Sequence, residues 1–133
     1  MAPSTHTTLG RQEDSPMEEI PKSVKRALRK LASAAHEEEL RRALVPLRAQ
    51  FDRWARGELS SGELSDSIHE FHQGPLRQLF ARYNSGMPDA AVAHAIVSGF
   101  INSSDVPPTV LAHLARALAF YESQREASEE SPR

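Results

Sequence analysis

The sequence contains no cysteine among its 133 residues. Disulfide bonds, thiolate nucleophiles and cysteine-based zinc or iron–sulfur sites are therefore excluded. Long apolar runs are also missing, and none approaches the ~20 residues that a membrane-spanning helix needs. The start of the chain lacks the basic segment and following apolar segment of a secretory signal. We therefore expect a cytoplasmic protein that makes no contact with a membrane.

An excess of charge of one sign is missing too, because 16 Lys and Arg face 18 Asp and Glu, for a net charge of −2. This balance argues against a dedicated polyanion-binding protein, although charge can be segregated locally. The two ends are rich in Ser, Thr, Pro and acidic residues, a composition typical of disorder. The length predicts one domain. We therefore expect a single helical domain over residues 21–124, between disordered tails at 1–20 and 125–133.

Strand patterns are nearly absent, and apolar residues recur at helical spacing along the chain. Two apolar stripes come first, made of Val24, Leu28, Leu31 and Ala35, and then of Leu40, Leu44, Leu47, Phe51 and Trp54. At 3.6 residues per turn the stripes are out of phase by about 150°. Either the helix breaks near Ser33–Glu37, or one long helix turns different faces to different neighbours. We favour the break, with a first helix capped by Ser23 and a second helix that starts at Ser33 and is kinked at Pro46.

The segment from Trp54 to Gly74 carries the densest set of local signals. Gly57 predicts a helix end, and Ser60 with Glu63 predicts a capping box at the next helix start. Gly74 and Pro75 predict another stop and start. Further helices are expected up to Tyr83, from Pro88, and from Pro107–Pro108. The sum is an all-α fold, an irregular bundle of five to six helices, with Trp54, Phe71 and Phe80 in its core.

The first candidate site consists of Asp66, His69 and His72, which we expect to be neighbours on one helix. One carboxylate and two imidazoles are ligands that transition metals accept, and His94 or His113 is a candidate fourth ligand. The alternative is that His72 packs against the bundle and His69 is a surface residue. The spacing matches no known metal motif, and no catalytic motif is present elsewhere, so the sequence assigns no catalytic residue and no resident cofactor.

The second candidate site is a basic run near the start of the first helix, formed by Lys22, Lys25, Arg26, Arg29 and Lys30. Positive charge at a helix N-terminus opposes the macrodipole, which hints at a use such as contact with nucleic-acid phosphates or an acidic protein. The alternative is a solvated face, balanced by the acidic residues Glu13, Asp14, Glu18 and Glu19 that precede it.

The third candidate site is an interface on the first stripe, Val24, Leu28, Leu31 and Ala35, which is out of phase with the stripe that follows. A short helix of this kind can present its apolar face to another chain. Trp54, Tyr83, Phe100 and Tyr121 are candidate anchors for such a contact. The alternative is that all these residues close the intramolecular core.

The pattern around Trp54, Gly57, Ser60, Glu63 and Leu64, continued by Ile68, His69, Phe71, His72 and Gly74, resembles a family of short uncharacterised bacterial helical proteins. The resemblance covers about Leu40 to Tyr121 and implies an all-helical fold without a known activity, catalytic residue or partner.

The sequence therefore favours a protein–protein interaction module without enzymatic activity, an accessory, adaptor or regulatory protein whose partner is another protein or a second copy. A metal-binding protein or metalloenzyme using Asp66, His69 and His72 is the first alternative. Nucleic-acid binding through Lys22–Lys30 is the second.

Overall fold

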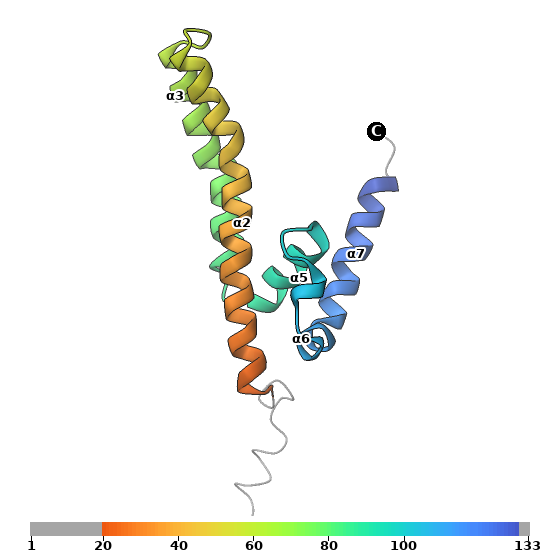
Figure 1. The fold of residues 1–133 in the computed structure, drawn as a ribbon. Helices are drawn as coiled ribbons and strands as arrows, with labels where there is room; N and C mark the ends of the chain where they lie inside the picture. The colour runs from red at the N-terminus through yellow and green to blue at the C-terminus, as the bar shows by residue number, and fades with distance from the viewer. Residues whose placement is uncertain (1–19, 131–133) are drawn as a thin grey trace, which may run out of the picture.

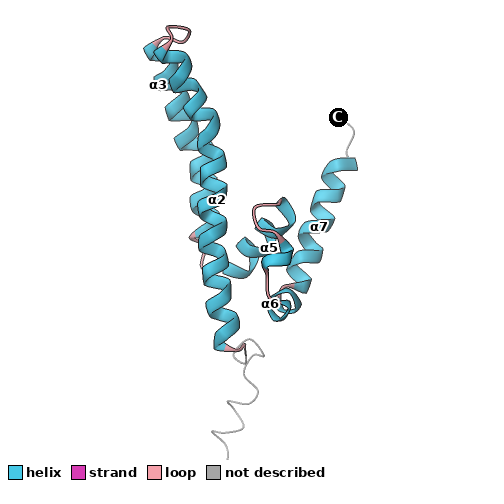
Figure 2. Cartoon of the chain, in the orientation of Figure 1, coloured by secondary structure: helices cyan, strands magenta, loops and turns pink. Residues whose placement is uncertain are grey.

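The computed structural model describes residues 20–130, in which every regular element is helical (Figures 1 and 2). The predicted all-α class is confirmed. The elements are α2 (Lys22–Ala55), α3 (Ser61–Phe71), the π-helical turn η2 (His72–Leu76), α4 (Arg77–Tyr83), α5 (Pro88–Ser98), the 3₁₀ turn η3 (Ser103–Asp105), α6 (Pro108–His113) and α7 (Ala115–Glu130). The predicted N-terminal tail lies outside the described residues, apart from Ile20. No helix among the described residues has the length and apolar composition needed to cross a membrane.

Helix α2 is one continuous helix of 34 residues, so the predicted break near Ser33 is wrong. Alanine-rich sequence around Ser33 favours helix and contains no Gly or Pro that would stop it. The first stripe packs against α5 and α6, and the second half of α2 lies along the α3–α4 arm. The helix starts after Pro21 without a side-chain cap, which corrects the expected Ser23 cap, and it continues through Pro46.

The chain returns along α2 as a second helical arm (Figure 1). Gly57, with φ of +81°, makes the turn, and the predicted capping box between Ser60 and Glu63 is present. The predicted stop at Gly74 is wrong, because the π-helical turn η2 carries the chain directly from α3 into α4. The wider π turn accommodates Pro75, which has no N–H to donate. Helices α2 and α3–α4 therefore form a long antiparallel hairpin.

The main hydrophobic core lies where the first half of α2 meets α5 and α6 (Figure 1). Its buried side chains are Val24, Leu28, Ala35, Val92, Ala95, Ile101, Val106, Val110 and Leu114. Helix α7 packs mainly on α5 and continues to Glu130, past the boundary expected at residue 124. Arg125 supports this last stretch by pairing with Glu122 and Glu129 along the helix.

The three aromatic residues expected in the core lie elsewhere. Trp54 is 44% exposed at the tip of the hairpin, and Phe80 is 65% exposed on α4, so the core prediction is wrong for both. Phe71 is half-buried. Within the α3–α4 arm only Leu64 and Leu79 are fully packed away from solvent. The reason is geometric, because two helices side by side share a single seam and leave their flanks in water.

Candidate functional site

The predicted metal ligands do not converge in the structure. Asp66 and His69 lie on α3, His72 opens the π-helical turn, and all three side chains are exposed. Over residues 20–130, no group of three His, Asp or Glu side chains is placed to hold a metal ion. His94 and His113 lie on α5 and α6. Helical spacing places the three residues near one another along the chain, but their donor atoms do not converge on a common point.

The predicted interface stripe is part of the intramolecular core. Val24, Leu28 and Ala35 are buried, and Leu31 is half-buried against them. The stripe is therefore largely covered by the chain itself, contrary to the expectation of an interface at these residues. The simpler alternative, closure of the chain's own core, is what the structure shows.

The predicted basic run is on the surface. Lys22, Lys25, Arg26, Arg29 and Lys30, which we call the basic segment, are all exposed on the first turns of α2. None of them forms an ion pair with a carboxylate in the part of the chain that the structure describes. The acidic residues from Glu13 to Glu19, which could balance them, lie outside the described residues. Within residues 20–130, no carboxylate thus compensates the charges of the basic segment through an ion pair.

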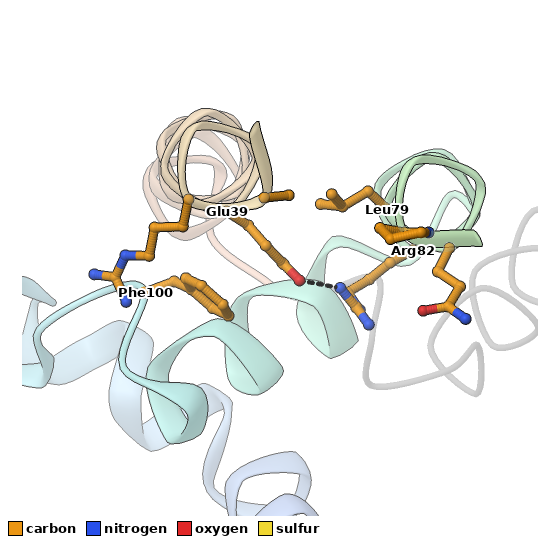
Figure 3. Close-up of a pocket in the computed structure, with 8 residues that line it drawn as sticks. Glu39, Leu79, Arg82 and Phe100 are labelled. Atoms are coloured by element: carbon orange, nitrogen blue, oxygen red, sulfur yellow. Dashed lines mark hydrogen bonds and ion pairs between the residues drawn. The ribbon is translucent and has the colours of Figure 1, made fainter. Parts of the chain in front are cut away.

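A cleft of about 430 Å³ lies between α2, α4 and the turn after α5 (Figure 3). It is lined by Glu39, Arg42, Ala43, Pro75, Gln78, Leu79, Arg82 and Phe100. In Figure 3, Glu39 on α2 and Arg82 on α4 reach toward each other across the cleft, and Arg82 Nη1 lies 2.6 Å from Glu39 Oε2. The Tyr83 hydroxyl donates to the other carboxylate oxygen of Glu39 at 2.9 Å.

The charges in this cleft are compensated by one another. Burial and the hydrogen bond to Glu39 raise the pKa of Tyr83, so its hydroxyl keeps its proton. The Arg42 guanidinium lies 5.0 Å from the centre of the Phe100 ring and pairs with Glu38 at 2.7 Å. These contacts tie α2 to α4 and to the residues after α5. We call the Glu39, Arg82 and Tyr83 contacts the brace, because they hold α2 against α4.

His94 is a second polar group held by its packing. Its Nδ1 is buried without a hydrogen-bond partner, and its Nε2 lies 3.4 Å from the Ser98 hydroxyl. The Tyr121 ring stands edge-on at 5.7 Å between centroids. Burial lowers the pKa of His94, and the positive charge of Arg82 adds to the effect. The His94 ring thus packs α5 against α7 in surroundings that disfavour its charged form.

Most of the exposed large apolar side chains lie on the hairpin formed by α2 and the α3–α4 arm. Six of the eight large apolar side chains that are exposed in the described part of the chain belong to it: Leu44, Val45, Phe51, Trp54, Ile68 and Phe80. A single surface apolar residue is ordinary, whereas several on one face mark an interaction surface. Four of these six side chains, those of Leu44, Phe51, Ile68 and Phe80, face the same side.

Contacts across the hairpin settle the direction of each side chain. Gln50 and Ser67 hydrogen-bond on the side that also carries the brace, and Leu79 faces α2. The next residue along each helix turns by about 100°. Because the helices run antiparallel, this turn carries both Phe51 and Ile68 to the same side, away from α5. Phe80 follows Leu79 to that side in the same way.

We call this surface the hairpin face. It comprises Leu40, Leu44 and Phe51 of α2 and Ile68, Leu76 and Phe80 of the returning arm. The side chains of Leu44, Phe51 and Ile68 are 41–42% exposed. The face lies opposite the brace, so α5 to α7 leave it uncovered.

The two edges of the hairpin face are basic. Along α2, a hollow of about 300 Å³ combines Leu40 and Leu44 with Arg41 and Arg48. Along the other arm, a hollow of about 410 Å³ combines Leu76 and Phe80 with Arg77. Arg77 donates to the neutral Gln73, and Arg41 reaches Glu37 only at 3.6 Å. Each edge therefore offers apolar contact and a cation that is weakly paired.

The sequence contained a signal for this face, in the second stripe from Leu40 to Trp54. Its 4–3–4–3 spacing is the a/d repeat of helices that pack side by side. We expected an interface on the first stripe and Trp54 of the second stripe in the core, whereas the first stripe is largely buried and Trp54 is 44% exposed. The returning arm is too narrow to cover the second stripe, which the α2 sequence alone does not reveal.

Comparison of the chain with protein-family models, with curated proteins and with solved structures finds no match. The resemblance to short bacterial helical proteins therefore stays a prediction.

Proposed function

We propose that this protein is a protein-binding module, an accessory, adaptor or regulatory protein that binds another chain through the hairpin face. The observation that carries the proposal is the exposure of large apolar side chains on one side of a two-helix arm. Each Å² of apolar surface left in water costs roughly 25 cal/mol. A bound helix would cover the hairpin face, much as α5 covers the other side near the base.

The setting that we propose is the bacterial cytoplasm, as inferred from the sequence. The test is affinity purification of the full chain from the cells that produce it. We expect a protein, or a second copy, to co-purify with the wild type and to be lost with Leu44→Asp and with Phe80→Asp. Ser123→Asp, on the exposed side of α7, is the matched control and should retain it. Co-purification of the same partner with all three variants would contradict the proposal.

The basic segment supports a second proposal, which is nucleic-acid binding through Lys25, Arg26 and Arg29. What favours it is that the basic segment is exposed and makes no ion pair with the carboxylates of residues 20–130. Retention on a DNA duplex should weaken steeply with salt and disappear when the three residues are replaced by Ala. Retention that survives this triple replacement would rule out the basic segment as the contact.

A further inference from the structure

We propose that the hairpin face binds an acidic amphipathic helix of a partner protein. The inference rests on the proposed function and identifies the chemistry of the partner. The shape of the surface is the first argument. Two antiparallel helices with apolar residues along their shared edge form a shallow groove, which is a common receptor for a third helix. The apolar stretch from Leu40 to Trp54 is about 20 Å long, which matches a partner helix of ~15 residues.

Charge gives the second argument. The hairpin face has Arg41 and Arg48 on one edge and Arg77 on the other. Arg48 forms no ion pair within residues 20–130. The carboxylate that lines the hollow beside Arg41 and Arg48, that of Glu37, is 69% exposed and weakly engaged. A helix with a leucine-rich stripe flanked by Glu or Asp would place its acids beside these arginines, and its apolar stripe on the groove floor.

The basic segment extends the same side of α2. Residues spaced by 11 complete about three helical turns, so Arg29, Leu40 and Phe51 lie in one line along the helix. Beside this line, Lys25 and Arg29 border a pocket of about 400 Å³ with Ile20, Met87 and Pro88 in its lining, and its one carboxylate, that of Asp89, is paired with His113. Met87 is 62% exposed there. A partner helix that continues toward the base of α2 thus meets more apolar surface with cations beside it.

The same charges disfavour a second copy as the occupant. In an antiparallel pairing that stacks Leu40 on Phe51, Arg41 lies beside Arg48 of the second copy. In a parallel pairing about a two-fold axis, the edge with Arg41 and Arg48 lies over the edge with Arg77 of the second copy. Like charges placed together at an interface cost affinity and exclude partners. The carboxylates of an acidic chain attract the arginines at the two edges, whereas a second copy places further arginines beside them.

The test is titration of the full protein with two synthetic helices of ~15 residues. The acidic peptide has leucine at heptad spacing with glutamate and alanine elsewhere, and the matched control has lysine in place of every glutamate. Neither contains tryptophan, so emission from Trp54, the only Trp and half-exposed at the end of the groove, reports binding at the site. We expect a blue shift with the acidic peptide, at least roughly tenfold tighter binding than with the lysine peptide, and weaker binding in high salt.

Two variants separate charge from apolar contact. The double variant Arg41→Gln, Arg48→Gln should bind the acidic peptide roughly tenfold more weakly, whereas Arg116→Gln on α7 should leave the affinity unchanged. Leu44→Asp should abolish binding of either peptide. Circular dichroism and the urea midpoint of each variant check that the fold is intact.

Other outcomes would overturn the inference. Equal binding of the two peptides, or none, excludes an acidic helix while leaving the co-purification test of the proposed function standing. A concentration-dependent dimer that Leu44→Asp dissolves would make a second copy the occupant. Preferential binding to phosphatidylserine vesicles, or to a DNA duplex with the same Trp54 shift, would replace the protein partner by a membrane or a nucleic acid.

Discussion

Glu39 on α2 and Arg82 on α4 form the ion pair that fixes the base of the hairpin, with 2.6 Å between Arg82 Nη1 and Glu39 Oε2. The pair is only partly exposed, and Glu39 also accepts the hydroxyl of Tyr83. Breaking an ion pair that is shielded from water and shares a hydrogen-bond network lowers the free energy of unfolding more than breaking an exposed pair. The brace is what holds the returning arm at its angle to α2, and so aligns the two halves of the hairpin face.

Replacing Glu39→Gln should lower the free energy of unfolding by about 1–3 kcal/mol, because Arg82 then loses its charged partner in a half-buried place. Glu37→Gln is the control, since its pair with Arg41 is open to solvent and should contribute less than about 0.5 kcal/mol. Urea unfolding of the two variants measures both values. Equal, small losses would mean that the brace does not stabilise the hairpin.

The position of the core predicts a contrast between two large apolar residues. Leu28→Ala should cost about 2–5 kcal/mol, because Leu28 is 3% exposed and its removal leaves a cavity. Phe80→Ala should cost less than about 1 kcal/mol, because most of the Phe80 ring is already in water. Chemical denaturation of the isolated protein gives both numbers. A loss for Phe80 as large as that for Leu28 would place its ring inside the molecule.

The capping box predicts a local effect at the hairpin tip. Ser60 Oγ accepts the Glu63 amide at 3.1 Å, and Glu63 Oε1 accepts the Ser60 amide at 2.9 Å. Ser60→Ala should therefore destabilise the protein by about 1 kcal/mol. Ser65→Ala, within the exposed face of α3, should be neutral. Thermal unfolding followed by circular dichroism compares them, and identical melting temperatures would show that the box adds nothing.

His94 predicts how stability depends on pH. Because folding lowers the pKa of His94, the unfolded chain takes up this proton first as the pH falls. The contribution of neutral His94 is therefore complete above the ordinary histidine pKa of about 6.5 and is lost as the pH drops below it. His94→Gln should flatten the dependence of the urea midpoint between about pH 7.5 and pH 5.5. An unchanged slope would assign the dependence to other groups.

The sequence predicted those features that depend on local chemistry. The helical class, the turn at Gly57, the capping box at Ser60 and the helix start at Pro88 all follow from residues close in the chain. The stops expected at Ser33 and Gly74 failed for a different reason. At Ser33 the surrounding alanine-rich sequence favours a continuous helix. At Gly74 the chain continues through a π-helical turn, and such a turn has no simple sequence signal.

The candidate site was predicted less well, because exposure is a property of the whole fold. The stripes at Val24–Ala35 and Leu40–Trp54 are similar in composition, and only the placement of α5 and α6 decides that the first is buried. Likewise, Asp66, His69 and His72 share a helix but no common point in space. The exposure of the basic segment could be predicted, since none of its members belongs to an apolar stripe.

The most direct test of binding at the hairpin face is photo-crosslinking in the cells that produce the protein. A photoreactive phenylalanine analogue replaces Phe80 in one protein and the exposed Thr109 of α6 in another. We predict that position 80 yields a discrete crosslinked protein, that Leu44→Asp removes it, and that position 109 yields none. Crosslinks of equal yield at both positions, or none at position 80, would contradict the account.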